Sequence, residues 1–314
     1  RFIAHFARQQ DAAVEAGDVH VARITDDGRD ARLALDGDRL VFGLGAQGAA
    51  VRRGNAARQD PGERQEMTAR LALITRHPIK SHGREDLASV RLLAGAALPW
   101  DRFWAVAHEA AKLRAGWSPC VNFARGAKAP ALMAVTCHLD ETARLVTLHH
   151  PTQGTHRFRP DAAEDLAGFL DWVRPLTPPD RAQPCQIVSA DRAMTDSDWP
   201  SVSILSLSSL ADLSARMGVE LSPHRFRGNL WIEGWAPWSE WDLLGRKVQI
   251  GAAVLMLRER ITRCKATTVD PATGQPKGDT LGALQSLYGH QDFGLYAEVV
   301  TGGEIALGQE VTVL

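Results

Sequence analysis

The sequence predicts a mainly β fold with some helix (α+β), built as two domains that follow an N-terminal extension. A length of 314 residues exceeds what one compact domain usually needs. From Met67 onward, short runs of alternating apolar and polar residues predominate, and helical spacing appears in only two stretches. The proline-rich passage at residues 175–184 separates two β-rich regions, so we expect a domain boundary near residue 180.

The composition is that of an ordinary globular protein. Hydrophobic residues make up 45% of the chain, and the formal net charge of -1 gives no bulk attraction to nucleic acid or to an anionic membrane. No apolar stretch approaches the roughly 20 residues of a membrane span, and no signal sequence is recognisable, so we expect a cytoplasmic protein. The cysteines are too far apart for a structural zinc or iron–sulfur site and are expected to be reduced: Cys120, Cys137, Cys185 and Cys264.

Residues 1–66 differ from the rest of the chain, because they contain no Lys, Cys, Trp or Tyr. One hypothesis is that the natural protein starts at Met67 and that residues 1–66 are an upstream fragment. The alternative is a small β element, since residues 19–24, 31–36 and 38–44 alternate like strands between Asp/Gly turns. The sequence leaves both readings open.

The expected first domain covers residues 67–180. Its predicted strands are LALIT at 71–75, WAVAH at 104–108, LMAVTCHL at 132–139 and ARLVTLHH at 143–150. Residues 161–173, DAAEDLAGFLDWV, have helical spacing, and Asp161 is the expected N-cap.

The expected second domain covers residues 181–314 and is again mostly β. A strand is predicted at QIVSA, residues 186–190, and a helix follows at 206–218, ending on Gly218 as its C-cap. Further strands are predicted at 230–234, 247–259, 296–300 and 310–314, with a loop-rich stretch over 264–279.

The glycines Gly43, Gly45 and Gly48 follow an apolar run and match the spacing of dinucleotide-binding units. Such a unit needs an amphipathic helix next, but the following residues contain Gly54 and Pro61 and little apolar stripe. A glycine-rich connector is the better interpretation.

Cys264 stands apart because it lies between Arg263 and Lys265 in a polar loop directly after a strong strand. Basic neighbours favour the thiolate form of a cysteine, and a thiolate is a soft, strongly donating metal ligand. On this chemistry alone, Cys264 is either a reactive or metal-ligating residue or a buried inert thiol.

Several motifs, in order, resemble the MOSC domain family together with its N-terminal β-barrel companion. They are RHPIKS at 76–81, DRFW at 101–104, SLADL at 209–213, FRGN at 226–229 and RCKATTVDPATG at 263–274. The pattern from Cys264 is similar to that of the mitochondrial amidoxime-reducing components and their bacterial relatives. The resemblance implies a β-barrel-like N-terminal domain and a MOSC β-barrel domain, with a molybdenum cofactor between them.

The resemblance also implies the site residues. Cys264 is the expected molybdenum ligand and catalytic residue. The pterin and its phosphate are expected to be held by residues of both domains: Lys80, Ser81, Arg102, Arg227 and Asn229. The remaining cofactor contacts are expected from Thr262, Arg263 and Tyr296. A dianionic phosphate needs cationic, fork-shaped donors, which agrees with this set.

By this resemblance, the protein is expected to be a molybdenum-dependent oxidoreductase that removes oxygen from N-hydroxylated or N-oxide-type substrates. No ferredoxin-like tail follows Leu314, so electrons are expected from a separate ferredoxin- or cytochrome b5-like donor with its reductase. Gly228 stands where the family usually has Pro, and WAPWSEW replaces an acidic segment, so the substrate is not carried over. A cofactor carrier and a sulfur-transfer protein with a persulfide on Cys264 are the alternatives.

Overall fold

The computed structural model describes residues 22–26, 29–36, 39–44, 68–189 and 192–314. The chain divides into two compact units, Arg1–Arg64 and Gln65–Leu314. In the first unit, three strands form an antiparallel sheet in the order β1-β2-β3: β1 Ala22–Asp26, β2 Arg29–Asp36 and β3 Arg39–Leu44. The small β element is therefore present, whereas Gly45 and Gly48 of the glycine pattern lie outside the described residues.

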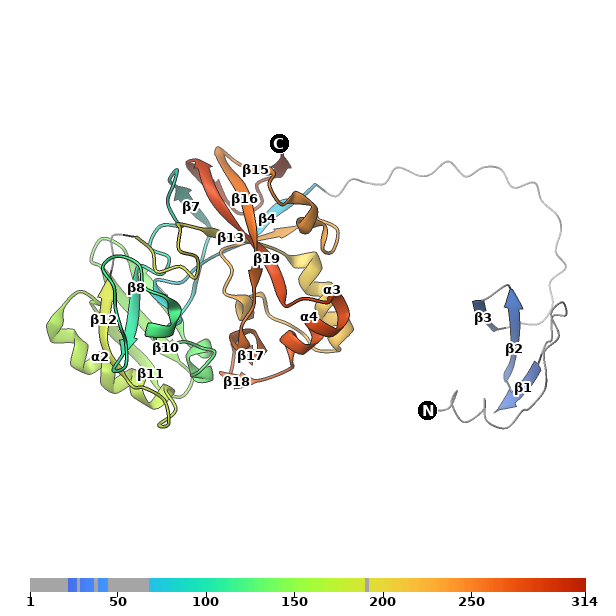
Figure 1. The fold of residues 1–314 in the computed structure, drawn as a ribbon, viewed down its shortest axis with the longest axis horizontal. Coiled ribbons are helices and arrows are strands. Elements are labelled where there is room, and N and C mark those ends of the chain that lie inside the picture. The colour runs from blue at the N-terminus through green and yellow to red at the C-terminus, as the bar shows by residue number, and fades with distance from the viewer. Residues whose placement is uncertain (1–21, 27–28, 37–38, 45–67, 190–191) are drawn as a thin grey trace. The chain divides into compact units, whose positions relative to one another are not determined.

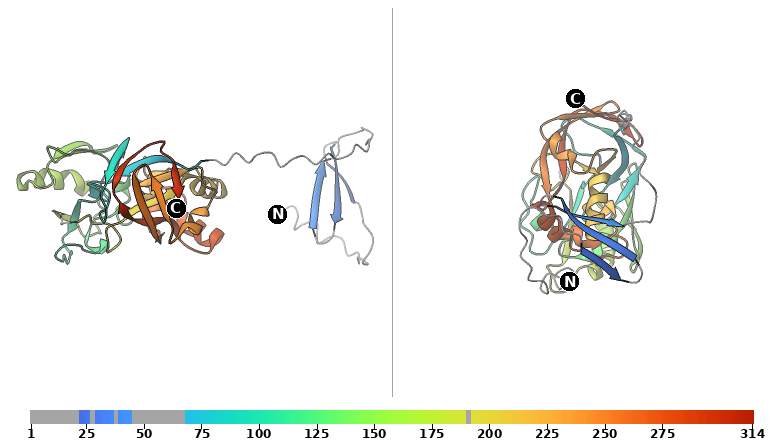
Figure 2. Two further views of the ribbon diagram at one scale, coloured as in Figure 1. Left: turned by 90° about the horizontal axis from the view of Figure 1, so that it is seen from above. Right: turned by 90° about the vertical axis from the view of Figure 1, so that its right-hand side faces the viewer.

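An eight-stranded sheet forms the largest part of the second unit (Figure 1). Its order is β21-β15-β16-β19-β13-β14-β4-β6, so β4, from the start of the unit, lies beside β14, which is far away in the sequence. The bounds are β4 Arg70–Arg76, β6 Glu85–Leu87, β13 Val202–Ser206, β14 Leu230–Glu233, β15 Lys247–Ile250, β16 Ala253–Thr262, β19 Asp292–Thr301 and β21 Val311–Val313. The sheet is strongly curved (Figure 2). The buried aliphatic core of this region includes Leu71, Ile204, Leu255 and Ile305.

Smaller sheets complete the unit. One has the order β12-β8-β5, and a second the order β11-β10-β9; β7 pairs with β20, and β17 with β18. The bounds are β5 Ile79–Lys80, β7 Ser89–Leu92, β8 Trp104–His108, β9 Thr136–Asp140, β10 Leu145–His150, β11 Gly154–Phe158, β12 Pro184–Ser189, β17 Val269–Asp270, β18 Gln275–Pro276 and β20 Gly303–Ala306. A second core, with Trp104, Leu148 and Phe169, lies among these strands and α2.

The predicted mainly β fold with some helix is confirmed, but the sheets of the described residues do not close into the predicted barrels. The eight-stranded sheet ends at β6 and β21. Val311 N donates to Ala69 O at 2.8 Å, and Leu71 N to Gln309 O at 2.9 Å, so the chain before β21 approaches the start of β4. The only β-bridge described there is Arg70 with Glu310. Because β21 has just three residues, the contact is too short to form a strand ladder.

The helices are α2 Leu166–Val173, α3 Leu207–Met217 and α4 Thr280–Tyr288. The helix predicted at 206–218 is confirmed: Ser206 Oγ accepts from Ser209 N, and Gly218 ends α3 with a left-handed φ of 63°. Asp161 is not an N-cap as predicted, because its carboxylate accepts from Trp104 Nε1 at 2.8 Å and pairs with Arg144. None of the helices described is long and apolar enough to cross a membrane.

Short 3-10 helices connect these elements: η1 Cys120–Asn122, η2 Pro130–Ala134, η3 Ala163–Asp165, η4 Arg174–Leu176, η5 Pro223–Phe226, η6 Ser239–Leu243 and η7 Lys265–Thr268. They explain one more difference from the sequence. The strand predicted at 132–139 starts only at Thr136, since Pro130 begins the helical turn of η2.

Candidate functional site

A pocket of about 240 Å³ lies where η5, η7 and the ends of β5, β16 and β19 meet. Eight of the nine residues that the resemblance implied line it: Lys80, Ser81, Arg102, Arg227, Thr262, Arg263, Cys264 and Tyr296. They come from both sides of residue 180. The structure therefore brings together residues that the sequence places far apart.

Cys264 is exposed at this pocket, immediately after β16. Its backbone holds the loop, because its carbonyl oxygen accepts from Thr267 N at 3.2 Å and from Thr267 Oγ1 at 3.1 Å. Thr267 is buried and lies 2.7 Å, Oγ1 to Oγ1, from Thr280 on α4. The side chain of Cys264 forms no cap hydrogen bond. The sulfur is thus presented on a fixed backbone, and the alternative of a buried inert thiol does not hold.

Arg263 is held by backbone carbonyl groups. Its Nη1 donates to Phe226 O at 2.9 Å and its Nε to Phe293 O at 2.7 Å. Burial lowers the pKa of Arg263 to about 10, although Tyr296 and the sulfur of Cys264 act in the opposite direction. These hydrogen bonds of the guanidinium therefore hold η5 against β19. Its role in the pocket is partly structural.

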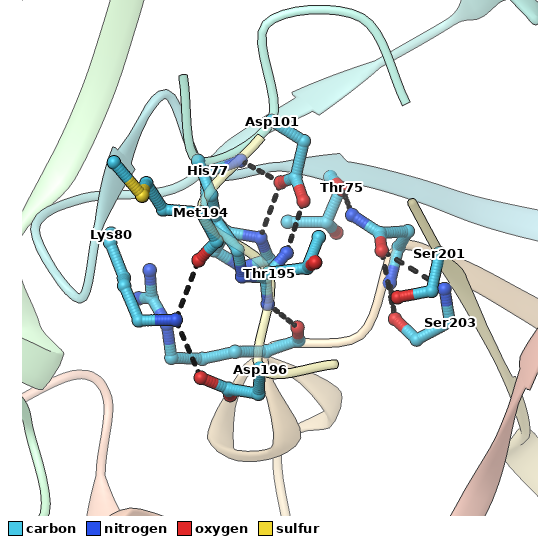
Figure 3. Close-up of polar contacts among 12 residues, drawn as sticks. Thr75, His77, Lys80, Asp101, Met194, Thr195, Asp196, Ser201 and Ser203 are labelled. Atoms are coloured by element: carbon cyan, nitrogen blue, oxygen red, sulfur yellow. Dashed lines mark hydrogen bonds and ion pairs between the residues drawn. The ribbon is translucent and has the colours of Figure 1, made fainter. Parts of the chain in front are cut away.

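Lys80 is buried beneath the pocket and is only 3% exposed. Its Nζ donates to Met194 O and to Asp196 Oδ1, both at 2.6 Å (Figure 3). Burial lowers the pKa of Lys80, and Asp196 partly offsets this effect. Desolvation would raise the pKa of Asp196, but Lys80 and Arg102 bring it down to about 2. Asp196 therefore stays ionised as the counter-charge to Lys80.

Arg102 belongs to a buried polar network with Asp101 and His77, and Figure 3 shows the carboxylate of Asp101 beside His77. Asp101 is 1% exposed and pairs with Arg102, and Asp101 Oδ1 accepts from His77 N at 2.8 Å. Burial would raise the pKa of Asp101, but Arg102 and His77 bring it far below the usual range. Burial acts to lower the pKa of Arg102, yet Asp101 and Asp196 raise it. Arg102 is therefore a permanent cation at the pocket wall.

Arg227 lacks such a counter-ion. Its recorded side-chain hydrogen bond runs from Nη2 to Gly83 O at 3.2 Å, and no salt bridge to it is found within the described part of the chain. Burial, together with the charge of nearby Arg102, lowers the pKa of Arg227 to about 9. An anion in the pocket would supply the charge partner that Arg227 does not find in the protein.

Three of the lining residues have left-handed backbone conformations: Ser81 with φ 64°, Arg102 with φ 53° and Arg227 with φ 48°. Side chains with a Cβ adopt this region at a cost of about 1–2 kcal/mol per residue. Trp100, Arg144 and Trp238 are the other non-glycine residues with positive φ in the described ranges. Strain of this kind, gathered around one pocket, is typical of a functional site.

Asn229 is the implied residue that does not line the pocket. It is 2% exposed and joins two strands of the large sheet: Oδ1 accepts from Ser203 Oγ at 2.9 Å, and Nδ2 donates to Thr75 O at 3.2 Å. All its recorded hydrogen bonds are thus made to the protein. It supports the backbone next to Arg227 rather than presenting a donor to the pocket.

Sequence reasoning missed several lining residues, among them Cys120, Arg125, Asp196 and Arg225. Arg225 is 1% exposed, and its Nη1 donates to Lys277 O at 2.6 Å, while its Nε has no hydrogen-bond partner in the part of the chain described. Arg225 stands two positions before Arg227 in the run HRFRGN, so the sequence could have indicated that both arginines belong to the site. Asp196 has no such signal in the sequence, and only its contact with Lys80 in the structure identifies it as a site residue.

The described residues contain no group of three or more His, Cys, Asp and Glu side chains that could hold a metal ion. What the pocket offers instead is one exposed thiol and a set of cations: Lys80, Arg102, Arg125, Arg225, Arg227 and Arg263. A single carboxylate, that of Asp196, lines the same pocket. This arrangement suits a dianionic group with a soft atom or metal near Cys264.

Comparison of the sequence with a family model and with a known protein agrees with the resemblance. Residues 191–312 match the MOSC domain. Mitochondrial amidoxime-reducing component 1 of Homo sapiens is 34% identical over 132 residues, which cover 38% of this chain and 38% of that protein. Among solved structures, the YUAD protein from Bacillus subtilis is similar at 13% identity and a TM-score of 0.37, covering 79% of this chain and 96% of that one. YiiM from Geobacillus stearothermophilus is similar at 17% identity and a TM-score of 0.28, covering 36% and 53%.

Proposed function

We propose that this protein, which contains a MOSC domain, binds a molybdenum cofactor in the pocket around Cys264 and reduces N-hydroxylated or N-oxide-type substrates. The observation that carries the proposal is the meeting of an exposed thiol with cationic side chains from both sides of residue 180. The similarity to an amidoxime-reducing protein supports the reaction class.

The residues present fit such a cofactor. Arg227, with its lowered pKa of about 9 and no ion pair described, and the unpartnered Nε of Arg225 are both suited to a dianionic phosphate. Lys80 and Arg102 carry charges already balanced by Asp196 and Asp101, so these two pairs contribute donors in a fixed geometry and little net charge. Cys264 would serve as the thiolate ligand of the metal.

When bound, the cofactor supplies two-electron oxygen-atom transfer, while the protein supplies position and electrostatics. The left-handed backbones at Arg102 and Arg227 preorganise the cations before any ligand arrives. Tyr296, whose pKa is raised to about 12 by burial and by Asp196, remains a neutral hydrogen-bond donor at the pocket. An external ferredoxin- or cytochrome b5-like protein would deliver the electrons.

The test compares native protein with Cys264→Ser and with the matched control Cys185→Ser, whose thiol is exposed on β12 away from the pocket. Molybdenum content and benzamidoxime reduction with a chemical electron donor are the readouts. We expect Cys264→Ser to lose most activity and much of its molybdenum, and Cys185→Ser to keep both. An unchanged molybdenum content in Cys264→Ser would contradict the assignment of Cys264 as a ligand of the metal.

The exposure of Cys264 also suits the two alternatives. A cofactor carrier would contain molybdopterin but reduce none of a panel of N-hydroxylated compounds. A sulfur-transfer protein would release sulfur from purified protein when treated with cyanide, and Cys264→Ser would abolish that release. The same purified samples thus distinguish the three functions.

A further inference from the structure

A second pocket, of about 210 Å³, shares Arg125 with the pocket around Cys264. Its walls come from the end of β8, the segment after η1 and the chain that follows η4. We propose that this second pocket binds hydrogen phosphate or a small phosphate monoester. The proposal goes beyond the function above, because neither the metal nor Cys264 takes part in it.

Charge is the first argument. Arg125, Lys128 and Arg181 line the pocket, and no Asp or Glu is among the described residues that line it. A tight turn places the first two together, since Lys128 N donates to Arg125 O at 2.9 Å. Arg181 Nε lies 3.7 Å from Asp180, but this pair is largely exposed and therefore weak. Three cations facing one cavity favour a doubly charged anion.

A buried hydroxyl is the second argument. Thr177 follows η4 and is only 8% exposed, and its Oγ1 has no hydrogen-bond partner within the described part of the protein. Because Thr177 lines the pocket, this hydroxyl is available to a ligand there. A buried polar group without a partner is costly, so a ligand that accepts from it gains affinity.

His108 defines the chemical class of the ligand. Its Nε2 lies 2.8 Å from the carbonyl oxygen of Val121, which can only accept, so Nε2 carries the hydrogen. In the neutral ring Nδ1 is then an acceptor, and it is buried without a partner in the described residues. A ligand that donates to this acceptor carries a hydroxyl as well as acidic oxygens. Hydrogen phosphate has both, as does a doubly charged monoester with a hydroxyl in its organic part, such as glycerol 3-phosphate, whereas sulfate has only the oxygens.

Isothermal titration calorimetry on the full chain as purified tests the proposal, with inorganic phosphate, glycerol 3-phosphate and sulfate as probes. We expect phosphate to bind at least about tenfold more tightly than sulfate, because sulfate leaves Nδ1 of His108 unpaired. Tighter binding of glycerol 3-phosphate than of phosphate would identify a monoester as the source, and weaker binding would identify free phosphate.

Variants locate the binding. Arg181→Gln and Thr177→Val should each weaken phosphate binding by about tenfold, since the first removes a cation and the second a hydroxyl donor. Thr177→Ser retains the hydroxyl and should bind like the native protein, as should the control Arg157→Gln on the exposed face of β11. Thermal unfolding of each variant shows whether a loss of binding reflects a loss of folding.

Two results would overturn the proposal. If Arg227→Gln weakens phosphate binding while Arg181→Gln and Thr177→Val leave it unchanged, phosphate occupies the pocket of Cys264 instead. If sulfate binds as tightly as phosphate, the acceptor role of His108 is wrong. Neither result depends on molybdenum, so failure here and failure of the proposed reductase function are distinguishable.

Discussion

Arg102 Nη2 donates a hydrogen bond to the backbone carbonyl of Arg227 at 2.9 Å, across 125 positions of sequence. Both residues have left-handed backbones, and both line the pocket of Cys264. Their charges have different surroundings, because Arg102 pairs with Asp101 whereas Arg227 has no carboxylate partner among the described residues. The two arginines should therefore respond differently to substitution.

Arg227→Gln removes a cation that the protein itself does not neutralise. We expect the free energy of cofactor binding to weaken by about 1.5–3 kcal/mol per charged hydrogen bond lost, so that less cofactor is retained. The cofactor-free protein should keep its stability or gain up to about 1 kcal/mol, because the pKa of about 9 shows that the charge is poorly accommodated. Pterin content and urea unfolding measure the two effects. A parallel loss of both would contradict the role assigned to Arg227.

Arg102→Gln should instead destabilise the folded protein, because it leaves the carboxylate of Asp101 buried without its cation. Breaking a buried pair in this way costs about 3–5 kcal/mol. Adding Asp101→Asn to the same chain removes the uncompensated charge and should restore part of that loss. A double-mutant cycle by urea unfolding measures the coupling. Additive effects of the two substitutions would show that the pair does not act as a unit.

The stability of the protein should depend on pH through His77, whose pKa is lowered to about 3 by burial, with a contribution from Arg227. The unfolded chain binds a proton near about pH 6.5, whereas the folded protein does not. This contribution to stability is therefore complete above about pH 6.5 and is lost as the pH falls towards 3, by up to about 1.4 kcal/mol per pH unit.

Urea unfolding between about pH 7 and about pH 4 checks this slope. His77→Asn should flatten the curve while keeping a donor for Asp101. His82, with a pKa lowered to about 4 by burial, leaves a residual slope in the same direction. The exposed His149 provides the control, since His149→Asn should leave the slope as it is. An unchanged slope in His77→Asn would mean that His77 does not contribute.

Local signals in the sequence were sufficient where a few neighbouring residues determine the structure. Ser206 and Gly218 marked both ends of α3, and the alternating runs marked most strands. The local signals failed for α4, because this helix carries little apolar stripe, although Asp279 caps it by accepting from Gly282 N. They failed again at Asp161, because its partner Trp104 is distant in sequence.

The site could be predicted only as far as its motifs reached. Six of the eight implied lining residues stand in the motifs that resemble a known family, whereas Asp196 meets Lys80 across 116 positions of sequence. Nothing local marks such a pair. The pairing depends on how the chain before β13 folds over β5, which is a tertiary property.

Gly228 follows Arg227 and stands where the resembling family usually has Pro. A Cβ at this position would lie 2.2 Å from Cδ1 of Leu205, which is fully buried. We therefore expect Gly228→Ala and Gly228→Pro to destabilise the protein by about 1–3 kcal/mol, because the core cannot take the added atoms. The control is Gly168→Ala in α2, where the added Cβ would lie 3.4 Å from His156. This substitution should stabilise the helix by up to about 1 kcal/mol. Thermal unfolding measures both; a stabilising Gly228→Pro would show that Leu205 can yield.

Thr267→Val tests whether the backbone of Cys264 must be held in place. The substitution keeps the shape of the side chain but removes the hydroxyl that donates to Cys264 O and contacts Thr280 Oγ1 at 2.7 Å. Because Thr280 is then left buried with one partner fewer, we expect a loss of about 1–3 kcal/mol in stability. Metal retention should fall as well, since the thiol is no longer fixed. Thr268→Val, whose hydroxyl donates only to Lys265 O among the described contacts, is the matched control. If both variants retain molybdenum equally, the position of Cys264 does not depend on Thr267.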